Sequence, residues 1–193
     1  NEINTEEYEV IDAKGNLVAP GLVDIHIHGY LGEDASDGSE TGLMIMAAGI
    51  AKNGVTSWCP TTMTIAKEEI LEAFHTARKV KAKKQCYGAK ILGINCEGPF
   101  INPSKKGAQP EEHILPPDGD IIEDNADILK LFTVAPEMEG ALACIEKVHK
   151  DGRVLASMGH TGASYDEANM GIGAGVRHTT HLFNAMTALQ HRN

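Results

Sequence analysis

Cysteine, long apolar segments and positive charge are all scarce in this chain of 193 residues. The four cysteines are scattered and form no Cys-x-x-Cys pair, a pattern that favours reduced thiols in a cytoplasmic protein over a disulfide framework. No apolar run approaches the ~20 residues of a membrane span. The acidic residues 1–9 lack the basic and apolar regions of a signal peptide. We therefore expect neither a membrane span nor a secretion signal.

The shortage of positive charge also limits the partners. The formal net charge of -10 argues against nucleic acid or an anionic membrane as a general partner. A small anionic substrate needs only local cations and is not excluded. The composition, 42% hydrophobic and 23% charged, is ordinary for a globular protein with a sizeable core.

The chain divides at Pro20-Gly21. Residues 1–19, with a possible short strand at 8–12 and turn residues at 13–16, resemble the end of a small β-sandwich domain. From residue 20 onward, strand-like runs alternate with helical patterns. The predicted strands are 22–28, 55–59 (closed by Pro60), 91–97, 131–135, 154–158 and 176–181. The predicted helices are 42–52, 66–83 with Thr64 as N-cap, 120–129, 139–150, and one opened by a capping box at 164–167.

This alternation predicts an α/β fold with a parallel sheet. A doubly wound sheet fits it as well as a barrel, but the polar residues at the strand ends favour the barrel. A complete (β/α)8 barrel has eight units and typically ~250 residues. We therefore predict that residues 20–193 form about six βα units of a partial TIM barrel, the N-terminal part of a longer protein.

His26 and His28 close the first predicted strand. Side chains alternate along a strand, so these two histidines share a face with Asp24. Neutral imidazole nitrogens in such a pair can bind one metal ion. The simpler alternative is a strand end with two hydrogen-bonded histidines.

Glu97 closes the third predicted strand, next to a Gly-Pro turn. Alternation places its side chain on the inner face with Asn95, where a carboxylate is costly to bury unless it is paired or binds a metal. A salt bridge or exposure at the rim is the alternative.

His160 and His181 each close one of the last two strand-like runs. Alternation gives His181 the same face as Thr179, so we expect His178 and Thr180 to face away and His178 not to be a ligand. Five candidate ligands from four strands then converge at one mouth, a pattern typical of metal-assisted hydrolysis. Packed histidines in a non-catalytic binding domain are the alternative.

Six segments of the chain carry a family resemblance. They are 20–29, 54–62, 97–103 (Glu-Gly-Pro-Phe-Ile-Asn-Pro), 106–109, 158–163 and 178–186 (His-Thr-Thr-His-Leu-Phe-Asn-Ala-Met). In this order they resemble the N-acetylglucosamine-6-phosphate deacetylases of the amidohydrolase superfamily. The resemblance implies hydrolysis of N-acetylglucosamine 6-phosphate to glucosamine 6-phosphate and acetate, in amino-sugar catabolism.

The resemblance also implies roles for particular residues. Glu97, His160 and His181 match the principal metal ligands, and His26 and His28 match ligands of a second ion that only some members hold. The metal is expected to be zinc or iron, as one or two ions. The positions that match contacts to the sugar phosphate are Ala108, Gln109, Asn184, Ala185 and Arg192.

Other implications concern parts beyond this chain. The general acid-base aspartate of the family is expected beyond Asn193, so no catalytic residue is assigned here and the chain alone is expected to be inactive. A homodimer of the full-length protein is also implied. A dihydroorotase-like cyclic amidase is the alternative enzyme. Many of those enzymes bridge two metals with a modified lysine at a strand end, whereas here Glu97 closes the third predicted strand and no lysine closes a later one.

Overall fold

The fold is organised by one curved parallel sheet. A computed structural model describes residues 8–83 and 88–189 of the chain. Six strands follow one another in chain order, and each pairs in parallel with the next. Their bounds are β1 (Leu22–Ile27), β4 (Val55–Thr62), β6 (Ile94–Phe100), β7 (Leu129–Val134), β8 (Leu155–Met158) and β9 (His178–Thr179). Because the strand order never reverses, this is the topology of a barrel and not of a doubly wound sheet. The predicted partial barrel is confirmed.

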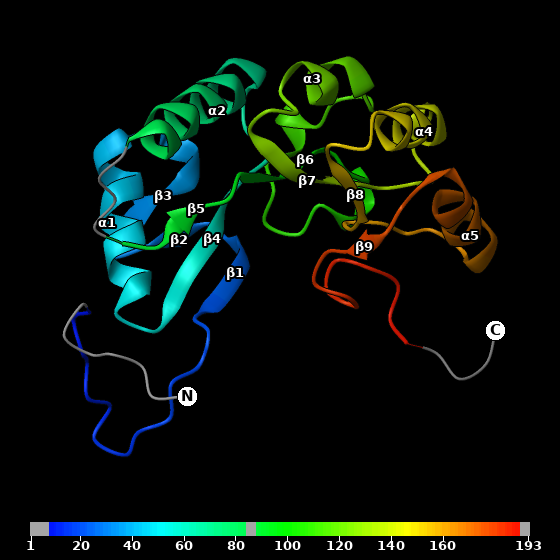
Figure 1. Ribbon diagram of the computed structural model, residues 1–193. Helices are drawn as coiled ribbons and strands as arrows, with labels where there is room; N and C mark the ends of the chain where they lie inside the picture. The colour runs from blue at the N-terminus through cyan, green and yellow to red at the C-terminus, as the bar shows by residue number, and fades with distance from the viewer. Residues whose placement is uncertain (1–7, 84–87, 190–193) are drawn as a thin grey trace.

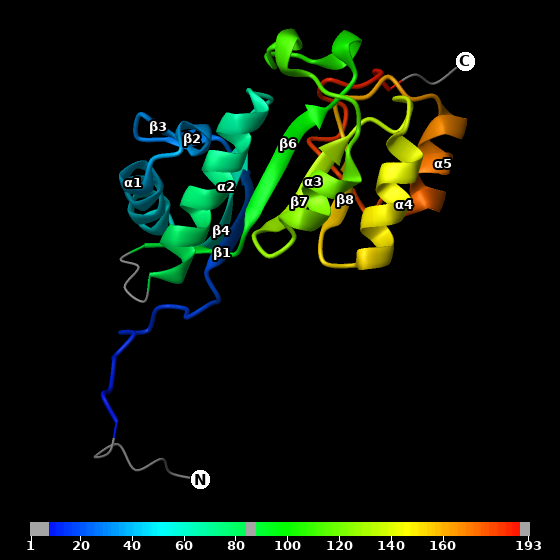
Figure 2. The same ribbon diagram turned by 90° about the horizontal axis from the view of Figure 1, so that it is seen from above.

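In the described part of the chain, the α-helices α1 to α5 cover one face of this sheet (Figures 1 and 2). They are α1 (Glu40–Ala51), α2 (Lys67–Ala82), α3 (Gly119–Asp124), α4 (Ala141–Asp151) and α5 (Tyr165–Ala174). Between helices and sheet lies an apolar core in which Trp58, Phe74 and Phe132 are fully buried. Each such side chain contributes ~1.5–3 kcal/mol through burial. The opposite face, called the inner face below, carries the polar residues.

The start of α5 confirms the predicted capping box, because Ser164 and Glu167 exchange side-chain to backbone hydrogen bonds. The start of α2 differs from the prediction. Its N-cap residue is Ala66, and the Thr64 hydroxyl instead approaches the carbonyl of Glu97, 3.5 Å away. Thr64 therefore belongs to the inner site and not to the helix end.

Two strand boundaries also differ from those predicted. β4 continues through Pro60 to Thr62, since β4 pairs with β5 (Lys90–Ile91) up to Trp58 and with β6 only from Thr61. On the side of β4 that faces β5 and β6, Pro60 lies between the two ladders, where its missing N–H is not needed. The single strand expected at 91–97 is divided into β5 and β6 near Gly93, where a Cβ would lie 2.4 Å from the Ile128 carbonyl oxygen.

The helix predicted over 120–129 is short. α3 ends at Asp124, and Leu129 already starts β7. Pairing at this position buries the Leu129 side chain fully in the core. A small antiparallel hairpin, β2 (Gly29–Tyr30) with β3 (Glu33–Asp34), follows β1 and was not predicted. The last strand, expected over 176–181, contains only two paired residues.

The segment before β1 does not show the strand expected at 8–12; residues 8–19 contain a turn at Lys14-Gly15 and lie mostly exposed. The assignment of residues 1–19 to a separate β domain stays a prediction. In the parts of the chain that the structure describes, no helix combines the length and the apolar character that crossing a bilayer requires.

Candidate metal centre

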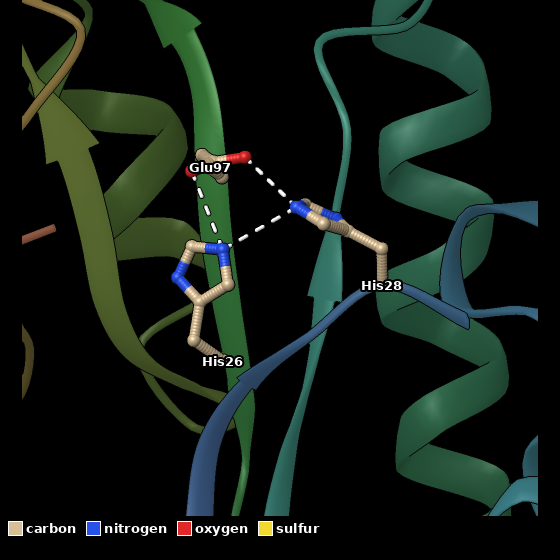
Figure 3. A group of neighbouring side chains, drawn as sticks. All are labelled: His26, His28 and Glu97. Atoms are coloured by element: carbon tan, nitrogen blue, oxygen red, sulfur yellow. Dashed lines mark hydrogen bonds and ion pairs between the residues drawn. The ribbon is translucent and has the colours of Figure 1, made fainter. Parts of the chain in front are cut away.

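Two histidines at the end of β1 face the inner side of the sheet, as alternation predicted. The Nε2 atoms of His26 and His28 lie 3.3 Å apart, and both approach Glu97 (Figure 3). The Nδ1 atom of His28 lies 3.0 Å from the carbonyl oxygen of Thr61 on β4. The neighbouring strand thus fixes the ring of His28.

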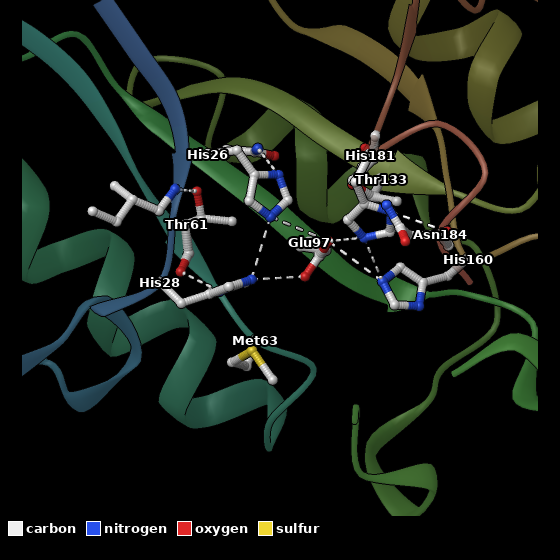
Figure 4. A network of polar contacts seen from close by, with 12 residues as sticks. His26, His28, Thr61, Met63, Glu97, Thr133, His160, His181 and Asn184 are labelled. Atoms are coloured by element: carbon white, nitrogen blue, oxygen red, sulfur yellow. Dashed lines mark hydrogen bonds and ion pairs between the residues drawn. The ribbon is translucent and has the colours of Figure 1, made fainter. Parts of the chain in front are cut away.

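Glu97 lies at the centre of the site, on β6, with only 2% of its side chain exposed. Its Oε2 atom is 2.9 Å from His28 Nε2 and accepts a 2.8 Å hydrogen bond from Gln109 Nε2. Its Oε1 atom is 2.9 Å from His181 Nε2 and 3.4 Å from the Nε2 atoms of both His26 and His160. Figure 4 shows the four rings converging on this one carboxylate.

The environment keeps Glu97 ionised. Burial alone would raise the pKa of this carboxyl group, but its contacts with His160, His28 and His26 outweigh burial and hold the pKa well below its usual range. The same carboxylate raises the pKa values of His28 and His160 against the opposing effect of burial. For His26, burial is the largest effect and lowers the pKa. Glu97 therefore meets these nitrogen ligands as an ionised carboxylate.

His160 and His181 enter the site from turns and not from strands. β8 ends at Met158 and β9 at Thr179, and both histidines have positive φ angles of 48° and 30°. Such backbone is uncommon for a non-glycine residue and persists where surrounding contacts enforce it. His160 Nδ1 lies 2.9 Å from the Lys105 carbonyl oxygen, and His181 Nδ1 lies 3.1 Å from that of Asn184.

These carbonyl contacts determine the tautomers of three rings. A carbonyl oxygen only accepts, so Nδ1 of His28, His160 and His181 must carry hydrogen and donate it. In the neutral rings each Nε2 then directs a lone pair into the site. The Nε2 atoms of His160 and His181 lie 3.1 Å apart, facing the buried Oε1 of Glu97. Among the described residues, the close polar partners of this Oε1 atom are imidazole nitrogens.

Lone pairs that face one another at these distances repel unless protons or a cation lie between them. Two groups of three ligands meet here, His26–His28–Glu97 and Glu97–His160–His181, each with its ligand atoms within 4.8 Å of one another. Imidazole nitrogen with carboxylate oxygen is a ligand set that suits zinc and iron. The residues present therefore fit a divalent metal ion.

The residues predicted to contact substrate have different positions. Gln109 is buried beside Glu97, whereas Ala108 and Asn184 are exposed at the rim. Ala185 is half-buried, and its carbonyl oxygen accepts a hydrogen bond from Thr161 N, next to His160. Arg192 lies outside the described residues. Of the predicted set, Gln109 thus contacts the candidate ligand Glu97 through its side chain, whereas Asn184 contacts the candidate ligand His181 through its backbone carbonyl.

Three orienting residues were missed, and one of them is Lys105, whose carbonyl oxygen holds His160. Thr61 supplies the carbonyl that orients His28, and Asn95 donates from Nδ2 to the carbonyl of Ile25 and faces His26 Nδ1 at 3.3 Å. Alternation along β6 already placed Asn95 on the inner face beside Glu97, and that was the available signal. Backbone carbonyls, in contrast, leave no trace in a sequence.

The predicted orientation of His178 and Thr180 was wrong. His178 Nδ1 lies 2.9 Å from the hydroxyl of Ser157, and the Thr180 hydroxyl contacts those of Ser157 and Thr133 on the inner face. β9 ends before His181, so alternation counted back from His181 gives the wrong faces. His178 nevertheless lies outside both groups of candidate ligands.

Comparison with known proteins agrees with this geometry. The family model described as "Amidohydrolase family" matches residues 17–191. This chain belongs to the amidohydrolase family. N-acetylglucosamine-6-phosphate deacetylase of Bacillus subtilis (strain 168) is 39% identical to it over 92% of the chain and 46% of the relative. N-acetylgalactosamine-6-phosphate deacetylase of Escherichia coli O157:H7 is 34% identical over 95% of the chain and 49% of the relative.

A solved structure of a named relative is also similar to this chain. The crystal structure of N-acetylglucosamine-6-phosphate deacetylase from Pasteurella multocida superposes with a TM-score of 0.82 at 32% identity, over 91% of this chain and 46% of that one. This amidohydrolase chain spans about half the length of the curated relatives it matches.

Proposed function

We propose that this amidohydrolase chain is part of an enzyme that removes the acetyl group from N-acetylglucosamine 6-phosphate, giving glucosamine 6-phosphate and acetate. The observation that carries the proposal is the buried Glu97 carboxylate, with four imidazole Nε2 atoms converging on it. The relatives named as deacetylases of this substrate support it.

The metal ligands in this proposal are Glu97, His160 and His181 for one ion, and His26 and His28 with the same Glu97 for a second. Zinc or iron is the proposed metal. A bound cation supplies Lewis-acid chemistry: it lowers the pKa of water and polarises a carbonyl group. The chain's own residues contribute a pre-organised set of ligands, because carbonyl oxygens of Thr61, Lys105 and Asn184 hold three rings in place.

Substrate binding is proposed for the rim. Ala108 lies on the loop after β6, whose Lys105 carbonyl contacts His160, and Asn184 and Ala185 lie on the turn after β9, which contacts Thr161. Arg192 completes the predicted contacts to the sugar phosphate. The proposed proton carrier is an aspartate beyond Asn193.

A homodimer of the full-length protein and a cytoplasmic location complete the proposal. The location is supported by three buried cysteines that form no disulfide in the described part of the chain, Cys59, Cys96 and Cys144.

The experiment that tests the function is acetate release by the complete protein with zinc or iron supplied. We expect turnover of N-acetylglucosamine 6-phosphate and none of a cyclic amide such as dihydroorotate. Cyclic amide hydrolysis without acetate release would contradict the proposal. Loss of turnover in Glu97→Gln, with His75→Asn on the exposed side of α2 as a histidine control, would connect activity to this site.

A second candidate substrate follows from the comparisons. The relative named N-acetylgalactosamine-6-phosphate deacetylase matches this chain at 34% identity, close to the values of the other relatives. The two sugars differ only in the configuration of one hydroxyl group, so both belong in the same assay. A higher kcat/KM for the galactosamine derivative would favour this second candidate and leave the metal centre unaffected.

A further inference from the structure

Gln109 is the residue whose contacts differ most from its predicted role. It lies on the loop after β6, and only 3% of it is exposed. Its Oε1 atom accepts a 2.7 Å hydrogen bond from the backbone N–H of Thr64. Its Nε2 atom donates a 2.8 Å hydrogen bond to Glu97 Oε2. Both ends of the side-chain amide are therefore used inside the protein.

The orientation of this amide is determined by its partners. A backbone N–H can only donate, so the atom that faces Thr64 N must be the amide oxygen. The other atom is then the NH₂ group, which meets an ionised carboxylate and forms a charge-assisted hydrogen bond. In the flipped amide, the NH₂ group would face the N–H of Thr64, a second donor, and the oxygen would face Glu97 Oε2, a second acceptor.

Thr64 contacts Gln109 through its backbone N–H and also contacts β6 through its side chain. It is fully buried, and its hydroxyl lies 3.5 Å from the Glu97 carbonyl oxygen. Gly98, with a φ angle of +85°, packs so closely on Thr64 that a Cβ at this position would lie 2.0 Å from the threonine hydroxyl. Thr64, Gln109 and Glu97 thus form a closed set of contacts around the end of β6.

This set of contacts restricts rotation of the carboxylate. Oε2 of Glu97 is held by Gln109 on one side and lies against His28 on the other. Oε1 is consequently turned towards His160 and His181, and its close polar partners among the described residues are imidazole nitrogens. If Gln109 were lost, the carboxylate could rotate away from the histidines.

We propose that Gln109 is a positioning residue that holds Glu97 in its metal-binding orientation, and not a residue that binds the sugar phosphate. The proposal rests on the proposed function only in requiring that the cluster binds a cation. A positioning role predicts that loss of Gln109 weakens zinc binding, whereas a substrate-binding role predicts that it raises KM. Loss of a residue that orients a metal ligand typically weakens metal binding by about 10–100-fold.

The test measures zinc affinity of the complete protein by competition with a chromophoric chelator, alongside KM for N-acetylglucosamine 6-phosphate at saturating zinc. Gln109→Met keeps the length of the side chain but removes both hydrogen bonds. We expect zinc binding to weaken about 10–100-fold and KM at saturating zinc to change less than about twofold. Glu112→Met, at an exposed position of the same loop, is the control and should bind zinc like the wild type.

Gln109→Asn is the second variant, because its shorter amide cannot reach both Thr64 and Glu97 and its smaller volume is easier to accommodate. Thermal unfolding of the metal-free proteins identifies the variants that fold. Unchanged zinc affinity in either folded variant, with a raised KM, would overturn the proposal in favour of a substrate contact. If the wild type binds zinc but releases no acetate, the proposed function fails while the zinc affinities still decide the role of Gln109.

Discussion

Four imidazole rings surround one carboxylate, but their hydrogen bonds make the rings unequal. Backbone carbonyls hold Nδ1 of His28, His160 and His181, whereas Nδ1 of His26 faces the amide NH₂ of Asn95. Because Asn95 Nδ2 also donates to the Ile25 carbonyl, this amide cannot be flipped without losing that bond. Neutral His26 therefore carries its hydrogen on Nε2, the atom that would have to bind a metal. Because this hydrogen must be displaced first, we expect the His26–His28–Glu97 group to bind a cation more weakly than the Glu97–His160–His181 group.

Substitution of single ligands tests this inequality. His28→Asn removes one ligand from the weaker group only, so the protein should keep its tighter cation. Glu97→Gln removes a ligand that both groups share, so binding of both should weaken by at least about tenfold. Metal content per chain after dialysis against limiting zinc measures both effects, and His75→Asn is the control. A larger loss of metal in His28→Asn than in Glu97→Gln would contradict the assignment of Glu97 as the shared ligand.

Much of this residue-scale picture was accessible from the sequence. Histidine and glutamate at the ends of strand-like runs predicted the five residues that the structure brings together. The orienting contacts were not predictable, since Thr61, Lys105 and Asn184 act through backbone carbonyls that any residue type would supply. The faces of His178 and Thr180 were wrong because a period-two pattern was extended past the end of a two-residue strand.

At the scale of elements, three loops at the mouth of the sheet are joined by one carboxylate. Glu137, after β7, accepts hydrogen bonds from Asn102 Nδ2 (2.8 Å), Gly162 N (2.6 Å) and Thr161 Oγ1 (2.5 Å). Asn102 follows β6, and Thr161 and Gly162 follow His160. In addition, Asn102 N donates to the His160 carbonyl oxygen at 3.0 Å. The backbone of His160 is therefore held from two neighbouring loops, which accounts for its positive φ angle.

Removal of this carboxylate should destabilise the fold. Glu137→Ala leaves the N–H of Gly162 and the hydroxyl of Thr161 without their partner, and each unpaired group costs ~1–3 kcal/mol. We expect the free energy of unfolding, measured by urea denaturation, to fall by roughly 2–4 kcal/mol. Glu139→Ala, at an exposed position two residues later, should change it by less than about 0.5 kcal/mol. Equal effects of the two substitutions would refute the role of Glu137.

The elements themselves were predicted unevenly, for physical reasons. Alternation of apolar strands with helices gave the six parallel strands, and the capping box placed the start of α5 correctly. The boundaries that failed are those decided by pairing. Pro60 is tolerated within β4 because it lies between two ladders, and Leu129 joins β7 because the core needs it. Neither circumstance is visible in a local window of sequence.

At the scale of the whole molecule, the candidate centre connects distant parts of one sheet. Its ligands come from β1, from β6 and from the turns after β8 and β9, so they meet only when all six parallel strands are in place. The edge strand β1 pairs only with β4 among the described residues, and its Leu22 and Val23 side chains are largely exposed. A cation bound at the centre would thus connect this edge strand to the opposite end of the sheet.

Thermal unfolding with and without zinc tests this central claim most directly. A cation that binds only the folded state, supplied at about 100 times its Kd, stabilises the fold by ~2.7 kcal/mol. For a chain of this size that corresponds to a rise in Tm of roughly 5–10 °C. The account predicts this rise for the wild type and at most about half of it for Glu97→Gln, because a site weakened at least about tenfold gains no more than ~1.4 kcal/mol at the same zinc concentration. An equal rise in both proteins, or none in either, would contradict a metal centre built around Glu97.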